Sequence, residues 1–319
     1  MKNRRSREPS RSVLVIGALV VAGACSKKAA QPTSAPSTPA ATTAAAGPAA
    51  VSDPAGKPAA KPEAVPREVD LGKLIAKLDE FKRKVFDQVV NREPSACGKG
   101  HSLLHSVKND TSCRASFYAV RYVARLADAG FSDPEISEKL EQRFRVPRVP
   151  YIDVSQAPSK GSPAGRVTIV EFVDYECDHC KQAQGLMHTL LAEYASDVTL
   201  YLKHFPFSSH INALNAAAAA AAAQNQGKFW QFNDKVWENS DHLRPALLEA
   251  LAKEIGLDFP RWYSEVGSPE VRGHVQRDRA EGGSLQIRRT PAIFINGRRY
   301  NDELDLPSLR DWIDEELGR

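Results

Sequence analysis

The spacing of apolar residues changes along this chain and predicts helical and strand-rich regions. Between residues 69 and 145, apolar positions recur at intervals of three and four, which is typical of amphipathic helices. The first stripe consists of Leu71, Leu74, Ile75, Leu78, Phe81, Val85, Phe86 and Val89. A second helix is expected at about residues 113–129, ending at Gly130. A third is expected to start at residues 132–135, where Ser132 or Asp133 can cap it and Pro134 suits the first turn.

A strand-type pattern begins after residues 155–165, where Pro, Gly and Ser cluster and a linker is expected. Residues 167–173 are mostly β-branched or aromatic and predict a buried strand, and residues 198–203 predict a second one. Residues 181–194 between them predict a helix. A strand, helix, strand succession of this kind implies two parallel strands.

The C-terminal residues predict a helical insertion followed by a hairpin and a helix. The insertion starts at about Ile211 and includes an unbroken alanine run at residues 216–223. Alanine has the highest helix propensity, although low-complexity sequence is the alternative interpretation. Residues 291–300 predict a hairpin, because Asn296-Gly297 suits the positive φ angles of a two-residue turn. Residues 306–317 predict an amphipathic helix.

The first 66 residues predict an export signal followed by a disordered linker. Residues 1–24 combine a basic start, an apolar run and small residues, as in an export signal. The sequence ending at Cys25 resembles a bacterial lipoprotein signal, in which this cysteine is lipidated after cleavage, although Ala22 stands where leucine is usual. An ordinary secretory signal is the alternative. Residues 25–66, rich in Ala, Pro, Thr and Ser, predict a disordered linker.

Charge and cysteine content narrow the class of protein. The 319 residues carry a formal net charge of +4, with basic residues scattered among acidic ones, which gives nucleic-acid binding little support. If Cys25 is lipidated, four of the five cysteines remain, an even number that suits an oxidising compartment. The simplest pairing joins Cys97 to Cys113 and Cys177 to Cys180.

Residues 67–150 predict a small helical domain that contains two cysteines. The informative residues are Cys97, Ser102-Leu103, the helix after Cys113, and Gly130-Phe131-Ser132-Asp133-Pro134-Glu135-Ile136 leading to Arg143. These residues resemble the helical domain of CcmH-type cytochrome c maturation proteins. That family has a Cys-x-x-Cys motif here, and Pro94 occupies the position of its first cysteine. We therefore expect Cys97 and Cys113 to form a structural disulfide. The alternatives are a second redox centre, or a zinc site completed by His101 and His105.

A Cys-x-x-Cys motif follows the first predicted strand. Cys177 stands at the junction of strand and helix, where free backbone N–H groups and the helix dipole favour a thiolate. We expect Cys177 to have a lowered pKa and to act as the nucleophile, and Cys180, one turn further on, to close the disulfide. The same spacing serves zinc sites and haem attachment, but Lys181 stands where haem attachment needs histidine.

Four motifs occur in order within residues 163–319. They are Val170-Glu171-Phe172-Val173-Asp174-Tyr175-Glu176-Cys177-Asp178-His179-Cys180, Lys203-His204-Phe205-Pro206-Phe207, Gln226-Gly227-Lys228-Phe229-Trp230 and Thr290-Pro291-Ala292-Ile293-Phe294-Ile295-Asn296-Gly297. Together they resemble the DsbA-like, thioredoxin-4 type thiol–disulfide oxidoreductases. The resemblance implies an α/β fold, namely a thioredoxin fold with a helical domain inserted at about residues 211–285.

The resemblance also implies roles for single residues. Cys177 would form a mixed disulfide with a substrate cysteine, and Cys180 would resolve it. His179 would stabilise the thiolate by charge or by a hydrogen bond. Glu171, placed at the end of the buried strand, would assist proton transfer at the resolving cysteine; the alternative is a strand-edge carboxylate paired with a surface lysine. Thr290-Pro291 would form the cis-proline loop that presents backbone groups to the substrate chain.

Two positions depart from the family pattern. Asp178 takes the place of the proline that follows the first cysteine in DsbA, and its negative charge should oppose a neighbouring thiolate. We therefore expect a less extreme oxidant. Arg289 replaces the glycine that many relatives have before Thr-Pro, and with Arg288 it either adds positive charge beside the site or is solvated. His204 and His210 are expected to be structural.

The function expected from the sequence is disulfide exchange with cysteine-containing exported proteins. The protein would lie on the periplasmic side of a bacterial cell envelope, held to the membrane by a lipid anchor, and would need no cofactor or metal. It would need a membrane redox partner, either a quinone-linked reoxidant or an electron donor. A disulfide reductase or isomerase is an alternative within this class, and a redox-inactive binding or scaffold lipoprotein is an alternative outside it. Copper handling has little support, because the chain has only two methionines.

Overall fold

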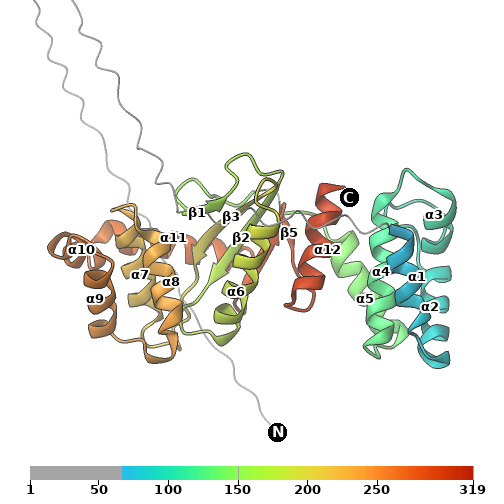
Figure 1. The fold of residues 1–319 in the computed structure, drawn as a ribbon, viewed down its shortest axis with the longest axis horizontal. Helices are drawn as coiled ribbons and strands as arrows, with labels where there is room; N and C mark the ends of the chain where they lie inside the picture. Colours follow the sequence, from blue (N-terminus) through green and yellow to red (C-terminus); the bar gives the residue numbers. More distant parts are fainter. Residues whose placement is uncertain (1–66, 150, 319) are drawn as a thin grey trace, which may run out of the picture. The chain divides into compact units, whose positions relative to one another are not determined.

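The computed structural model describes residues 67–149 and 151–318 (Figure 1). The predicted export signal, the lipidation site at Cys25 and the predicted linker before residue 67 lie outside these residues. Among the described helices, none is long and apolar enough to cross a membrane.

Within the described residues, five α-helices and one π-helical turn precede the sheet. They are α1 (Arg67–Ala76), α2 (Glu80–Arg92), α3 (Leu103–Asn109), α4 (Arg114–Asp128), α5 (Asp133–Leu140) and η1 (Glu141–Arg145). The Asp79 side chain caps α2 by accepting a hydrogen bond from the N–H of Lys82. Gly130, two residues after the end of α4, has a φ of +88°, a left-handed conformation that stops the helix. These helices enclose a core of their own, which includes Phe86, Val89, Val90, Leu103, Val120, Val123, Ile136 and Leu140.

The helical region differs from the sequence-based expectation at two points. Phe81 is 76% exposed, because the apolar stripe is divided between α1 and α2 and the new helix that starts after Asp79 turns Phe81 toward solvent. The helix α3 was not expected, because a seven-residue helix is too short to show a periodic stripe. Its start is nevertheless marked by Ser102, whose hydroxyl accepts from the N–H of His105.

A disulfide joins Cys97, in the loop after α2, to Cys113, which directly precedes α4. Their Cα atoms are 5.9 Å apart. The two sulfur atoms are bonded to each other and cannot act as the thiolate ligands of the alternative zinc site with His101 and His105.

In the part of the chain that the structure describes, the sheet has five strands in the order β1-β3-β2-β4-β5. They are β1 (Ser159–Gly161), β2 (Val167–Val173), β3 (Val198–His204), β4 (Ala292–Ile295) and β5 (Arg298–Arg299). β2 and β3 are parallel, as predicted, and the other pairs are antiparallel. The β1 strand lies where a linker was expected. It pairs with β3, and at Gly165 a Cβ atom would lie 2.6 Å from the Thr199 hydroxyl oxygen, so glycine permits this close approach.

Helices cover both faces of the sheet. On one face, α6 (Asp178–Glu193) and α12 (Leu306–Leu317) pack on β2, β3 and β4 through a core that includes Ile169, Met187, Leu190, Leu200, Ile293, Leu309 and Trp312. On the other face, Phe172, Phe205, Ile287 and Phe294 form a smaller cluster. The helix α6 begins at Asp178 rather than at Lys181, so the second cysteine of the motif lies inside its first turn.

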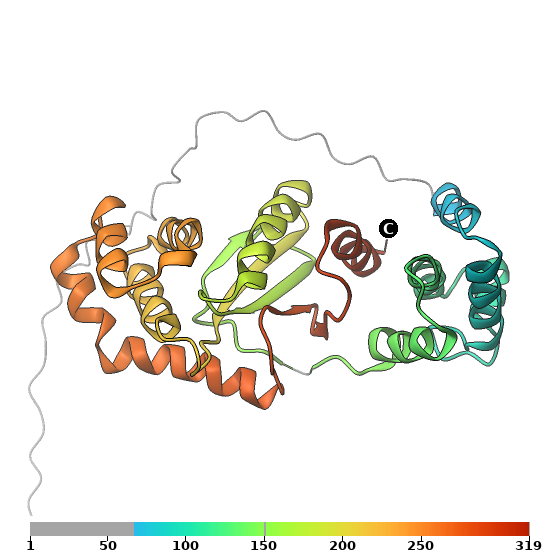
Figure 2. The ribbon, with the colours of Figure 1, turned by 90° about the horizontal axis from the view of Figure 1, so that it is seen from below.

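The helical insertion consists of five α-helices and a short 3₁₀ turn between β3 and β4. They are α7 (Ala213–Gln224), α8 (Phe229–Glu238), the turn η2 (Ser240–His242), α9 (Pro245–Glu254), α10 (Phe259–Val266) and α11 (Pro269–Ser284). All eight alanines at residues 216–223 are buried, because α8, α9, α10 and α11 surround α7. The alanine run is thus the centre of a packed domain. From there α11 leads back along the sheet to β4 (Figure 2).

A buried arginine connects η1 with the C-terminal residues. Arg143 is 2% exposed, and its guanidinium donates to Asp302 at 2.8 Å and to Glu315 at 3.2 Å. The guanidinium carbon also lies 4.7 Å from the ring centroids of Tyr122 and Trp312. The charge is therefore both paired and stacked on aromatic rings, which offsets the cost of removing it from water.

Candidate active site

The Cys-x-x-Cys motif lies where β2 gives way to α6. Cys177 is the N-cap residue of α6 and is half-buried, whereas Cys180 is 1% exposed. The N–H of Cys177 donates to the carbonyl oxygen of Asp174 at 3.0 Å, which fixes the turn that leaves the strand. One thiol therefore faces solvent at the positive end of a helix, and its partner lies inside the fold.

The environments of the two thiols shift their pKa values in opposite directions. The pKa of Cys177 is lowered to about 5, first by a hydrogen bond from the Cys180 thiol and then by Thr290 and the backbone N–H groups of Cys180 and His179; partial burial opposes this. Burial raises the pKa of Cys180 well above its usual value. At neutral pH the sulfur of Cys177 is a thiolate and that of Cys180 a thiol. Disulfide exchange requires these two roles, an exposed nucleophile and a protonated resolving cysteine.

The Thr290–Pro291 peptide bond is cis and lies against Cys177. The Sγ atom of Cys177 is 3.2 Å from the carbonyl oxygen of Thr290. The resemblance implied both the cis bond and its position, and the structure has both. Because Pro291 is half-buried, one side of the loop remains accessible next to the reactive sulfur.

Glu171 is a buried carboxyl group beneath the motif. It lies within the central strand β2, with Phe172 and Val173 still to follow, rather than at the strand's end. The residue is 1% exposed, and its Oε1 atom has no hydrogen-bond partner in the described part of the chain. Burial raises its pKa to about 8, and its charge would in turn raise the pKa of Cys180. The alternative of an edge carboxylate paired with a surface lysine is therefore wrong.

A cleft of about 810 Å³ opens beside the cis-proline loop. It is lined by His179, by residues 289–293 and 299–304, and by Lys139, Gln142 and Val146 of the helical region. The side chain of His179 is exposed there, and the residue acts on Cys177 through its backbone N–H. Arg299 joins Arg289 on the wall of the cleft, and its pKa is lowered by burial and then by the charges of Arg289 and Arg288. The basic residues thus form a cluster beside the site.

A family model described as thioredoxin (Thioredoxin_4) matches residues 154–315 of this chain. The chain belongs to the thioredoxin family, in its DsbA-like branch. The model spans both the Cys-x-x-Cys turn and the cis-proline loop, the two segments that meet at Cys177, and it begins after the N-terminal helices α1 to η1.

Comparisons with individual proteins each cover about half of the chain. The thioredoxin-like oxidoreductase from Silicibacter pomeroyi DSS-3 has a TM-score of 0.46 and 27% identity, over 51% of this chain and 94% of that one. Oxidised BdbD from Bacillus subtilis has a TM-score of 0.49 and 22% identity, over 52% and 96% of the respective chains. The Na(+)/H(+) antiporter NhaA 3 of Salinispora tropica is 33% identical over 159 residues, 50% of this chain but 24% of the antiporter. The chain thus spans about a quarter of the length of the curated relatives it matches.

The two histidines of the thioredoxin domain that were expected to be structural lie in different settings. His204, at the end of β3, is fully buried, and burial lowers its pKa to about 4. Neither ring nitrogen of His204 has a hydrogen-bond partner among the described residues. His210 lies 2.8 Å from the buried carboxylate of Asp174, which also accepts from the N–H groups of Phe207 and Glu176. Asp174 therefore ties the loop after β3 to the turn that carries Cys177.

Sequence reasoning overlooked Glu176, which precedes the reactive cysteine. Its carboxylate accepts from the backbone N–H groups of Asn212 and Ala213 at 2.8 and 3.0 Å, and so holds the start of α7 against the active-site turn. Next to this contact, Ile211 is 89% exposed and Leu214 is 42% exposed. An acidic residue is favourable at a helix N-terminus, but here carboxylate and helix are far apart in sequence, so no local pattern reveals the pair.

Proposed function

We propose that this protein is an exported thiol–disulfide oxidoreductase that exchanges disulfides with cysteines of envelope proteins through Cys177 and Cys180. The observation that carries the proposal is the pairing of a half-exposed thiol, whose pKa is about 5, with a buried thiol whose pKa is raised, against the cis Thr290–Pro291 bond. A thiolate that forms at neutral pH beside an accessible backbone segment suits attack on, and release from, a protein disulfide.

The oxidation of a substrate dithiol then takes two exchanges. In the disulfide form, a substrate thiolate attacks the sulfur of Cys177, the Cys177–Cys180 bond breaks, and a mixed disulfide forms. The second thiolate of the substrate then attacks the substrate sulfur that is bonded to Cys177. This forms the substrate disulfide and releases Cys177 as a thiolate. The substrate loses two electrons and two protons, and the cysteine pair gains two electrons.

Glu171 supplies the proton that the inner sulfur needs. Because its pKa is about 8, the carboxyl group is protonated at neutral pH and can protonate Cys180 as that sulfur leaves. In the reverse direction the carboxylate accepts the same proton. Burial raises the pKa of Cys180, so its unprotonated thiolate is unfavourable inside the fold. The sulfur of Cys180 therefore needs a proton when it leaves and must lose one before it attacks.

The substrate chain would lie along the cis-proline loop, with Thr290 and Pro291 presenting backbone groups to it. The cationic residues Arg289 and Arg299 on the cleft wall favour substrate segments with acidic residues near the cysteine. Lipidation at Cys25 would hold the protein at the periplasmic side of the cell envelope. Either a quinone-linked reoxidant or a membrane electron donor would restore the active redox state.

We favour the oxidising direction. A lowered pKa stabilises the reduced form of the pair, which makes the disulfide a stronger oxidant. The value of about 5 lies between about 7 for thioredoxin and about 3.5 for DsbA, so we expect an oxidant weaker than DsbA. A reductase or isomerase with the same site would differ in its reduction potential.

The test is an exchange assay on a peptide with two cysteines, with wild type, Cys177→Ser and Cys180→Ser. Cys177→Ser should abolish peptide oxidation. Cys180→Ser should accumulate a mixed disulfide between Cys177 and a single-cysteine peptide that is supplied as its symmetric disulfide, because Cys177 displaces one peptide thiol and no second cysteine resolves the product. Full activity of Cys177→Ser would overturn the proposal and favour a scaffold. Equilibration of the pair with glutathione buffers then gives the direction, because a potential near that of thioredoxin indicates a reductase.

A further inference from the structure

The disulfide outside the thioredoxin domain has one exposed and one buried side. Cys97 is exposed in the loop Cys97-Gly98-Lys99-Gly100, all four of whose residues are exposed. Cys113 is 3% exposed and is the N-cap residue of the 15-residue helix α4. An attacking thiolate can therefore reach the sulfur of Cys97, and the sulfur that would leave lies at the positive end of a helix.

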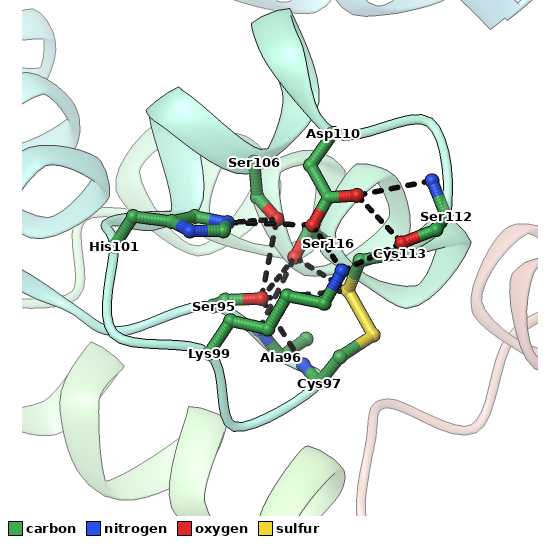
Figure 3. Close-up of a disulfide and its surroundings, with 10 residues drawn as sticks. All are labelled: Ser95, Ala96, Cys97, Lys99, His101, Ser106, Asp110, Ser112, Cys113 and Ser116. Carbon is green, nitrogen blue, oxygen red and sulfur yellow. Dashed lines mark hydrogen bonds and ion pairs between the residues drawn. A yellow bond between two sulfur atoms is a disulfide. The ribbon is translucent and has the colours of Figure 1, made fainter.

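Two buried hydroxyl groups contact the sulfur of Cys113 (Figure 3). Ser95 donates to it at 3.4 Å, and the Ser116 hydroxyl lies 3.1 Å from it. Since a disulfide sulfur carries no hydrogen, Ser116 is the donor in the second contact. Both serines are at most 1% exposed.

The backbone orients these two hydroxyl groups. The N–H of Cys97 donates to Ser95 Oγ at 3.3 Å, and the N–H of Ala96 donates to Ser116 Oγ at 3.2 Å. Each hydroxyl oxygen thus already accepts a hydrogen bond, which leaves its own proton to point elsewhere, and Cys113 Sγ is within reach of both. The arrangement is a small donor pocket around one sulfur.

A hydrogen-bonded path connects this sulfur with a half-buried histidine. The Ser95 hydroxyl lies 3.1 Å from that of Ser106, which in turn lies 3.2 Å from Nε2 of His101. Figure 3 shows these side chains converging on Cys113 from the loop after α2, from α3 and from the start of α4. Hydroxyl groups in such a series can pass a proton to the sulfur as it leaves.

We propose that Cys97–Cys113 is a second thiol–disulfide exchange site, which accepts electrons from a protein dithiol. A partner thiolate attacks Cys97 Sγ, the bond to Cys113 breaks, and Cys113 leaves as a thiolate stabilised by Ser95, Ser116 and the start of α4. The second thiolate of the partner then attacks the partner sulfur that is bonded to Cys97, and Cys97 is released as a thiolate. The partner dithiol loses two electrons and two protons and becomes a disulfide, and Cys97 and Cys113 take up both electrons and two protons and become thiols.

The first test asks which sulfur glutathione attacks in the folded full-length protein. Trypsin separates the two cysteines, because residues 93–99 carry Cys97 and residues 109–114 carry Cys113. The native protein is treated with reduced glutathione, quenched with acid and digested, and the peptides are weighed. We expect glutathione on Cys97 alone, with free thiol at Cys113. A disulfide that stays intact until the protein is unfolded would overturn the proposal and leave a purely structural link.

The second test uses Ser116→Ala, with Ser112→Ala as the matched control. Ser112 is exposed, precedes Cys113 and donates to Asp110 rather than to sulfur. Loss of the Ser116 donor should slow glutathione attack at Cys97 about three- to tenfold, because the leaving thiolate is less stabilised, and Ser112→Ala should react like wild type. Mere loosening of the loop would instead speed the attack, so an unchanged or increased rate in Ser116→Ala would overturn the role of the donors.

The second site stands independently of the first. If Cys177→Ser lacks peptide oxidation while glutathione still adds to Cys97, both proposals hold for their own cysteines. If Cys177→Ser remains active, the function proposed for the thioredoxin domain fails, and the reaction at Cys97 is unaffected.

Discussion

The sulfur of Cys177 lies 3.2 Å from the carbonyl oxygen of Thr290, although 113 residues separate the two in sequence. The whole helical insertion, α7 to α11, lies between them in the chain. A reactive thiol and the backbone that would align its substrate are thus brought together by the pairing of β4 with β2. Mutations that shift this pairing should affect exchange without touching either cysteine.

The ionisation of Cys177 can be measured by alkylation of the reduced protein with iodoacetamide. With a pKa of about 5, its rate should reach half its maximum near pH 5, while Cys180 stays unmodified. Because the Cys180 thiol is the largest contributor, Cys180→Ala should move the midpoint to higher pH. A wild-type midpoint near 8.5, the ordinary thiol value, would contradict the assignment of Cys177 as the nucleophile.

Glu171→Gln should change how stability depends on pH. The folded protein holds the Glu171 proton up to about pH 8, whereas the unfolded chain releases it near 4.5, so wild type loses stability as pH rises between these values. Glu171→Gln has no such loss. Its free energy of unfolding, measured in urea, should exceed that of wild type by an amount that grows from pH 5 to pH 8, to at most about 5 kcal/mol.

The exposed Glu238, whose side chain is 60% accessible, provides the control for Glu171. Glu238→Gln should follow the wild-type pH profile. Parallel profiles for Glu171→Gln and wild type would show that the buried carboxyl group does not retain its proton. In exchange assays, Glu171→Gln should also slow the step in which Cys180 leaves, because no group replaces its proton.

Charge reversal at Arg289 tests the basic cluster beside the cleft. Arg289→Glu should slow exchange with peptides that carry acidic residues next to their cysteine and speed it with basic ones, about three- to tenfold at low salt, and added salt should reduce both effects. Arg244→Glu, an exposed position on the insertion that lies outside the cleft, should leave both rates unchanged. Equal effects of the two substitutions on both peptides would indicate a general charge effect.

Arg143 should be among the most sensitive positions for stability. Arg143→Ala removes a buried guanidinium from Asp302 and Glu315, which keep Arg125 and Arg298 as partners. It also leaves a cavity beside Trp312, and should lower the free energy of unfolding by about 2 to 5 kcal/mol. Arg83→Ala breaks an exposed pair with Asp87 on α2 and should cost less than about 1 kcal/mol. Thermal or urea unfolding of both variants checks the contrast, and similar losses would contradict the role of burial.

Elements whose apolar pattern lies within their own residues were predictable from the sequence. β2 coincides with the predicted strand at residues 167–173, β3 extends the prediction by one residue, and α12 has the predicted bounds. These elements carry their signal locally, as continuous apolar runs or as a stripe with a cap. The two halves of the candidate active site were found because each has a motif of its own.

Features that depend on contacts between distant segments were not predictable. The β1 strand lies in a Pro-, Gly- and Ser-rich segment. It is a strand because its backbone pairs with the edge of β3. Arg299 reaches the cleft through the register of the hairpin, and Glu176 caps a helix 36 residues away. The two serines that contact the sulfur of Cys113 come from different segments, and neither stands out in a residue pattern.

The burial of α7 also bears on how the gene can change. A single-base change in an alanine codon gives valine, threonine, serine, proline, glycine, aspartate or glutamate. Each of these adds volume, introduces a polar group or weakens a helix whose eight consecutive alanines, residues 216–223, are all enclosed. The most repetitive stretch of the folded chain should therefore tolerate mutational drift least, and silent codon changes should greatly outnumber replacements there.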